Sequence, residues 1–143
     1  MDKEAIRADI IREIAELLFL EEEEVNGDMS MTEDLGVDSL EMQELYGRLS
    51  KKYRISLNLI RIINDAAIVV DNGKTGDGEK MMEEVSEIMK MEFNRQDIDK
   101  VKGKIEKGST GRLLEMIQGF VTVDMLADAV KKTMLEERGS CDK

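Results

Sequence analysis

The chain has 143 residues, with 32 acidic and 21 basic side chains, no histidine and a formal net charge of −11. A chain of this length forms a single domain, with room for an insert but not for a large enclosed active site. An acidic surface repels nucleic acids and anionic membranes, which excludes both as expected partners. The lack of histidine excludes imidazole metal sites and histidine-based catalysis.

The composition favours an all-α fold, since proline and tryptophan are absent and only 3% of residues are aromatic. Residues 1–55 hold 15 acidic and 7 basic side chains, a net charge of −8, and residues 56–143 hold 17 and 14, a net charge of −3. The single cysteine, Cys141, excludes a disulfide framework. The longest apolar run, 66–70, is too short for a bilayer, so we expect a cytoplasmic protein without stable membrane insertion.

Two helices and a long loop are predicted in the first part of the chain. Isoleucines at helical spacing predict a first helix over about 3–22, and residues 25–38 form a loop. The second helix is predicted from Ser39 to about Tyr53. The loop residues expected to anchor in the core are Val25, Met29, Met31 and Leu35, and the expected buried positions of the second helix are Leu40, Leu45, Leu49 and Tyr53.

The stretch from 56 to 120 is predicted as further helices. Residues 57–70 are either a buried helix or a helix that ends in a short extended piece, and 71–79 form a loop. Amphipathic helices follow over about 79–93 and around 98–105. A break at 108–110 offers a cap for the next helix, and Thr122 is predicted to cap the last one. Residues 138–143 are predicted to be disordered.

The methionines allow two interpretations. They either fill a helical core or form an adaptable lining for a long, flexible apolar ligand. The residues concerned are Met42, Met81, Met82, Met89, Met91, Met116, Met125 and Met134.

The most informative motif is LGVDSL, at residues 35–40. It places Ser39 at the first turn of a helix, after an aspartate and a flexible glycine. An anion on that hydroxyl would lie at the positive end of the helix dipole. The alternative is that the serine merely caps the helix, since serine is among the preferred residues there.

This motif resembles the serine site of the acyl carrier protein family. The resemblance is sharpest over 35–41 and covers about half of the chain, including the acidic loop 25–34, the ending 53–55 of the second helix and the lead 120–124 into the last. It implies an acyl-carrier-type four-helix bundle that spans 1–143 as a single domain, with additional helices inserted over about 57–119.

The resemblance also implies a covalent 4′-phosphopantetheine on Ser39, which a phosphopantetheinyl transferase installs from coenzyme A with magnesium. The arm would hold an acyl chain as a thioester for acyl synthases or transferases. We expect a monomer. The residues assigned to partner docking are Asp38, Leu40, Glu41, Glu44 and Arg48, and those assigned to the acyl cleft are Leu45 and Leu49.

Two departures from the family pattern indicate a specialised carrier in fatty-acid, lipid or polyketide-type synthesis. The second helix begins acidic but continues with Arg48, Lys51, Lys52 and Arg54, where fatty-acid carriers are usually acidic. About sixty residues also separate Ile55 from the last helix, more than a plain carrier needs.

Neither a catalytic residue nor a metal site is assigned. The sequence Gly73-Lys74-Thr75 fails as a phosphate-binding loop because Ile68 stands where a glycine is required. A calcium loop beginning at Asp71 fails because Met82 replaces the glutamate at its twelfth position. We therefore expect a non-catalytic carrier. The alternative is an unmodified, carrier-like docking or regulatory module whose insert binds a protein partner.

Overall fold

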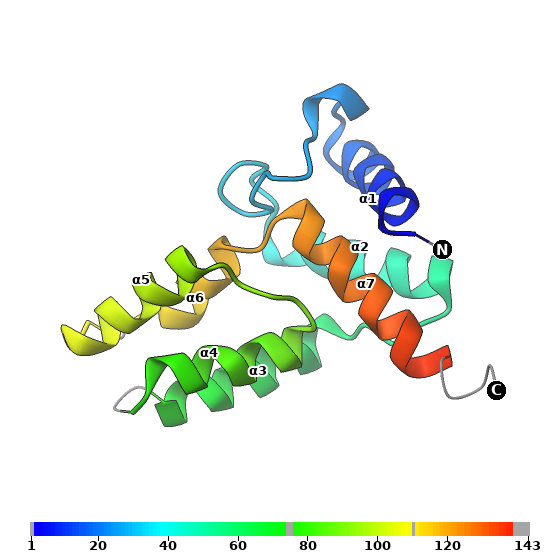
Figure 1. The fold of residues 1–143 in the computed structure, drawn as a ribbon. Coiled ribbons are helices and arrows are strands. Elements are labelled where there is room, and N and C mark those ends of the chain that lie inside the picture. The colour runs from blue at the N-terminus through cyan, green and yellow to red at the C-terminus, as the bar shows by residue number, and fades with distance from the viewer. Residues whose placement is uncertain (1, 74–75, 110, 139–143) are drawn as a thin grey trace. The chain divides into compact units, whose positions relative to one another are not determined.

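A computed structural model describes residues 2–73, 76–109 and 111–138 of the chain. Within these ranges the fold is helical, with one isolated antiparallel bridge between Ser30 and Thr122 (Figure 1). The prediction of an all-α carrier-type bundle with additional helices before the last one is confirmed. The elements are α1 Lys3–Leu18, the 3₁₀ helix η1 Glu22–Glu24, α2 Ser39–Tyr53, α3 Leu59–Gly73, α4 Gly78–Met89, α5 Arg95–Glu106, α6 Leu113–Gly119 and α7 Val123–Arg138.

The chain divides into two compact units. The first unit is Met1–Leu59 together with Val121–Lys143, and the inserted unit is Ile60–Phe120. The organisation of 1–143 as a single carrier domain stays a prediction. None of the helices in the described ranges is long and apolar enough to cross a membrane.

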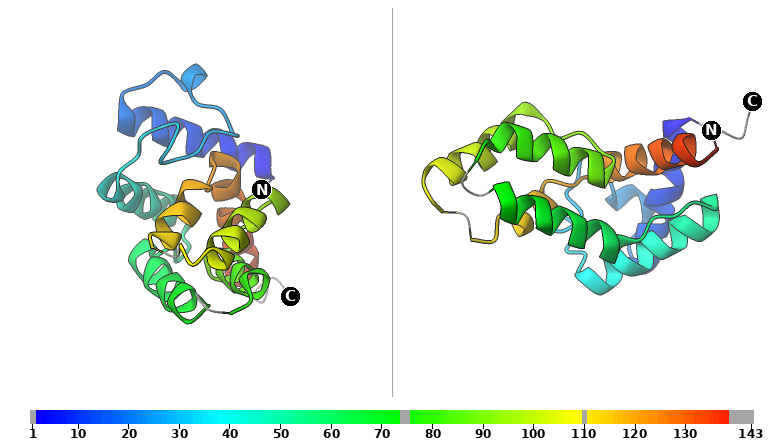
Figure 2. Two further views of the ribbon diagram at one scale, coloured as in Figure 1. Left: turned by 90° about the vertical axis from the view of Figure 1, so that its left-hand side faces the viewer. Right: turned by 90° about the horizontal axis from the view of Figure 1, so that it is seen from below.

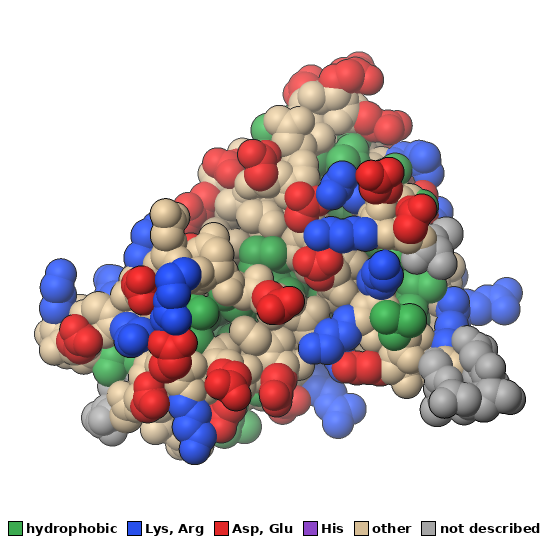
Figure 3. All heavy atoms as spheres, viewed as in Figure 1, with side chains coloured by type: hydrophobic (Ala, Val, Ile, Leu, Met, Phe, Trp, Pro, Cys, Tyr) green, Lys and Arg blue, Asp and Glu red, His purple; other side chains and the backbone are tan. Residues whose placement is uncertain are grey.

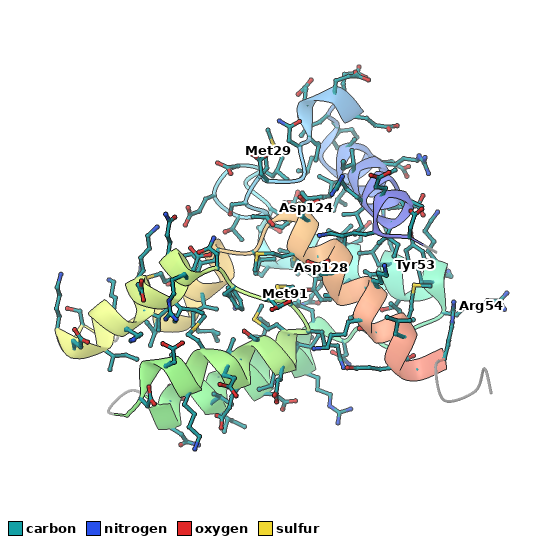
Figure 4. All side chains as sticks on the ribbon, viewed as in Figure 1. Met29, Tyr53, Arg54, Met91, Asp124 and Asp128 are labelled. Atoms are coloured by element: carbon teal, nitrogen blue, oxygen red, sulfur yellow. The ribbon has the colours of Figure 1, made fainter. Side chains whose placement is uncertain are left out.

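In the first unit, α1 packs against both α2 and α7 (Figure 2). Ile6, Ile10 and Ile14 follow one another at four-residue spacing on one face of α1 and are fully buried. Two ion pairs join α1 to successive turns of α7: Arg7 Nε lies 2.5 Å from Asp124 Oδ1, and Lys3 Nζ lies 3.0 Å from Asp128 Oδ1. Figure 4 shows both aspartates on α7. The apolar seam and these pairs fix the last helix beside the first.

The first helix ends earlier than predicted. It stops at Leu18, because Phe19 adopts a left-handed conformation with φ of 58° and terminates the hydrogen-bonded ladder. Glu22–Glu24 then form a separate 3₁₀ turn rather than the last turn of α1. Four exposed glutamates, 21–24, cover this end, where acidic side chains gather at the top of Figure 3. A continuous helix would have placed these carboxylates at the negative end of its dipole.

The inserted unit begins with α3, which is helical throughout. The extended alternative for 57–70 is therefore wrong, and the helix continues to Gly73, so the following loop is shorter than predicted. Two side-chain contacts join elements within this unit. Glu79 on α4 accepts from Arg95 and Lys102 on α5, and the rings of Phe93 and Phe120 meet edge to face with centroids 6.4 Å apart. The buried methionines of the unit are Met81, Met82, Met89 and Met91.

The helix caps after residue 106 differ partly from the predictions. The residue before α6 is Arg112, in a left-handed conformation and without a side-chain cap bond; Thr110 of the predicted break lies outside the described residues. The cap of the last helix is confirmed, since the Met125 amide donates to Thr122 Oγ1 at 3.2 Å. Arg138 belongs to α7, so predicted disorder was wrong there, and residues 139–143 lie outside the described ranges.

Candidate functional site

The loop that precedes α2 is attached to the beginning of α7 by backbone hydrogen bonds. The Met31 amide donates to the Val121 carbonyl at 2.9 Å, and the Val123 amide donates to the Met29 carbonyl at 3.1 Å. Met31, Val121 and Val123 are all buried. The loop is therefore a fixed part of the first unit, although its sequence alone predicted only a few anchor residues.

Residues 30–34 form a compact turn within this loop, shortly before Ser39. The Ser30 amide donates to the Asp34 carboxylate at 2.7 Å, and the Glu33 amide donates to Ser30 Oγ at 3.1 Å. Gly36 follows with φ of 68°, a conformation that a glycine adopts without strain. The sequence analysis missed the part played by Ser30 and Asp34. Serine and aspartate four residues apart in a loop are the available signal, because their side chains readily bond nearby amides.

The start of α2 is closed by a complete capping box. The Glu41 amide donates to Asp38 Oδ1 at 2.7 Å, and the Asp38 amide donates to Glu41 Oε1 at 3.0 Å. Asp38 is thus the cap, and Ser39 is the first residue inside the helix. The cap is therefore Asp38 and not Ser39, although the pair marks the start of the helix as that alternative expected. Ser39 is exposed at this first turn.

Leu40 is 73% exposed, so its predicted burial was wrong. An α-helix turns by about 100° per residue, so Leu40 lies about 140° around the axis from Leu45 and on the outer side of α2. Leu45, Leu49 and Tyr53 are buried as predicted. Tyr46, which the sequence analysis did not assign, is also buried, and this burial raises its pKa to about 12.

Arg48 connects α2 to α1. Its Nη2 lies 2.6 Å from Glu44 Oε2, one turn earlier on α2, and its Nη1 lies 3.2 Å from Glu13 Oε1 on α1. The hydrogen bonds to Glu44 and then Glu13 raise the pKa of the Arg48 guanidinium above its ordinary value. Two of the residues predicted for docking, Glu44 and Arg48, are therefore bonded to each other. Their role toward a partner stays a prediction.

The two residues predicted to line an acyl cleft lie in the closed core of the first unit. Leu45 and Leu49 have no exposed surface and stand one turn apart on the inner side of α2. The structure thus brings Asp38, Ser39, Leu40 and Glu41 together at the start of α2, where the first three are exposed and Glu41 is half-buried. It separates them from the two leucines, which point away into the core.

The sequence of this chain matches known carrier proteins. Residues 1–73 match the family model described as the C-terminal ACP domain of the highly reducing polyketide synthase sdgA. An acyl carrier protein from Exiguobacterium sibiricum is 44% identical over 57 residues, which are 40% of this chain and 72% of that protein. No solved structure matches.

A helical fold with an exposed serine at the start of α2 and these two matches define a carrier protein. The chain belongs to the acyl carrier protein family. The family match includes α1, α2 and α3 and ends at residue 73, so α4, α5, α6 and α7 lie beyond it.

Proposed function

We propose that this chain carries acyl intermediates as thioesters on a 4′-phosphopantetheine arm attached to Ser39. The observation that carries the proposal is the exposure of Ser39 at the first turn of α2, within the motif that the family resemblance singles out. In this role the chain performs no catalysis and is a substrate for other enzymes.

The site fits a phosphodiester on Ser39 for two reasons. The positive end of the helix dipole favours an anion at this turn. Asp38 and Glu41 make the capping box between them, so the cap of α2 does not use the Ser39 side chain. When bound, the arm supplies a thiol that forms the thioester, and Ser39 supplies the oxygen that holds the arm.

The exposed residues around Ser39 support its use as a docking site. The exposed Asp38 and the half-buried Glu41 present carboxylates on either side of the serine, and Leu40 adds an exposed apolar side chain. A phosphopantetheinyl transferase, and later the acyl synthases or transferases, would recognise this combination. Glu44 and Arg48 would contribute as an ion pair rather than as separate charges, since they already bond to each other.

An acyl chain would shelter by entering the core beside Leu45 and Leu49. Both are fully buried, so the chain must separate packed helices to reach them. Each buried methylene contributes about 0.8 kcal/mol, so a longer acyl chain gains more free energy by entering the core.

The arm on Ser39 then replaces repeated bimolecular encounters with delivery from one attachment point. The cargo belongs to fatty-acid, lipid or polyketide-type synthesis, and the carrier acts as a cytoplasmic monomer.

The proposal is tested by intact mass after incubation with coenzyme A, magnesium and a phosphopantetheinyl transferase of broad specificity. We expect wild type to gain one phosphopantetheine unit and Ser39→Ala to gain none. Ser109→Ala, which removes another exposed serine, is the matched control and should be modified like wild type. A folded, helical wild type that gains no mass contradicts the proposal and favours the unmodified docking module. That module would still bind its partner after Ser39→Ala.

A further inference from the structure

The beginning of α7 lies against the loop that leads to Ser39. Gly27 is the point of closest approach: a Cβ placed there would lie 2.6 Å from Asp124 Oδ1 and 2.8 Å from its Cγ. The Asp124 amide also donates to the Gly27 carbonyl at 2.8 Å. Figure 4 shows Met29 in this loop and Asp124 at the start of α7. A side chain at position 27 would therefore require the Asp124 carboxylate to move.

Asp124 cannot easily move away from this contact. Arg7 Nε on α1 lies 2.5 Å from its carboxylate, so a rotation that made room for a side chain at position 27 would also have to rearrange that ion pair. The first helix, the last helix and the loop therefore meet at one carboxylate.

Hydrogen bonds continue from this contact to the serine. The Met31 amide donates to the Val121 carbonyl at 2.9 Å, and the Val37 amide donates to the Met31 carbonyl at 2.9 Å. Val37 is buried and precedes Asp38, which caps the helix that Ser39 begins. The two hydrogen bonds thus lead from Val121, just before α7, through Met31 to Val37, two residues before Ser39.

We propose that Gly27 is a positioning residue for the modification of Ser39, because its lack of a side chain lets the loop lie against Asp124 at the start of α7. The start of α7 sets the conformation of the loop and, through Met31 and Val37, the orientation in which Ser39 meets the transferase. This inference rests on the proposed function. It adds that a residue about a dozen positions before Ser39, in contact with one about eighty-five positions after it, sets the rate at which Ser39 accepts the arm. Val121, which takes part in the connection, is also the first residue after the inserted unit.

The test uses the rate at which Ser39 accepts phosphopantetheine, measured on full-length variants at a temperature where circular dichroism shows each one folded. Gly27→Ala should lower kcat/KM by about tenfold, since small misplacements of a reacting group cost large factors. The double variant Gly27→Ala with Asp124→Ala should recover most of the loss, because it removes the atoms that clash. Gly103→Ala is the matched control: a glycine with open space around it, expected to react like wild type.

A second variant acts on the backbone instead. Val123→Pro removes the amide that donates to Met29 and places the proline ring against that carbonyl, while the first position of a helix accepts proline. It should slow the modification at least as much as Gly27→Ala.

If Gly27 only stabilised the fold, variants that remain folded would leave the backbone around Ser39 unchanged. Amide NMR shifts near Ser39 therefore provide the deciding readout. The shifts of Val37 and Ser39 should change in the same order as the rates. The inference is overturned if folded Val123→Pro keeps the wild-type rate and the wild-type Ser39 shift, or if the double variant recovers nothing. If wild type itself accepts no arm, the proposed function fails, whereas the amide shifts still decide the positioning.

Discussion

The two units of this chain build their cores from different side chains. In the described residues, the first unit buries mainly isoleucine, leucine and valine, with one buried methionine, Met31, whereas the inserted unit buries four methionines. Branched aliphatic side chains have few rotamers and specify one packing, while methionine adapts to irregular space. The unit that holds Ser39 is thus the more strictly specified one. The inserted unit is built to tolerate change.

The largest effect is expected from truncating the core beside the serine helix. Leu49→Ala should lower the free energy of unfolding of the first unit by about 3 kcal/mol, because it deletes fully buried methyl groups and leaves a cavity. Met82→Ala, a similar truncation at an equally buried site of the inserted unit, should cost that unit less, about 2 kcal/mol, because the neighbouring methionines can move into the cavity. Urea unfolding followed by residue-resolved amide signals measures both. Equal losses would remove the distinction between the two cores.

Two helical glycines of the inserted unit differ in the space around them, and one of them limits how much change that unit tolerates. A Cβ at Gly78 would meet Lys102 Cγ at 3.0 Å and Ile105 Cδ1 at 3.2 Å, whereas a Cβ at Gly103 meets nothing. Gly103→Ala should stabilise the unit by about 0.5–1 kcal/mol, because alanine favours the helix. Gly78→Ala should destabilise it by about 1 kcal/mol through overpacking. Thermal unfolding of the pair measures the difference, and an equal response of both would show that α4 and α5 move apart freely.

The caps of α1 and α2 give a smaller contrast inside the first unit. Asp38→Ala removes the bond that the Asp38 side chain accepts from the Glu41 amide, leaves the capping box incomplete and should cost about 1 kcal/mol. Asp2→Ala removes a single cap bond, to the Ala5 amide, at an exposed end and should cost less. Thermal unfolding compares the two variants. A larger effect of Asp2→Ala would mean that the start of α2 is held by the loop rather than by its box.

The sequence predicted elements well where one local pattern determined them. The bounds of α2 were predicted correctly, and the Thr122 cap followed from residue type and position. The errors arose where local patterns left several conformations open. Phe19 ends α1 through its left-handed backbone, and nothing in an aromatic side chain announces such a conformation. Leu40 was misplaced because its apolar side chain was weighed above its angular position on the helix.

The candidate site divides in the same way. The serine and its neighbours were visible as a contiguous motif, so Ser39, Asp38 and Glu41 could be named from the sequence alone. The contacts that hold the loop join residues about ninety positions apart, such as Met31 and Val121. One sequence without an alignment carries no signal for pairs that meet only after the chain has folded.

The smallest predicted effect concerns the ion pairs on the surface of the inserted unit. Hydrogen bonds from Arg95 and then Lys102 lower the pKa of Glu79 from 4.5 to about 2. A carboxyl group whose pKa is lower in the folded protein contributes stability above its ordinary pKa and loses it as the pH falls toward the lowered value. The stability that Glu79 adds should therefore be complete at neutral pH and decline between about pH 4.5 and pH 2.

Glu79→Gln isolates this contribution from the other carboxylates, which also titrate at low pH. The variant should be slightly less stable than wild type at pH 7, and the difference should vanish near pH 2. Glu83→Gln, at another exposed glutamate of α4, is the matched control. Because the Glu79 ion pairs are exposed, added salt should shrink the difference at pH 7 as well. A difference that persists at pH 2 would mean that Glu79 stabilises α4 and α5 through packing of its side chain rather than through its charge.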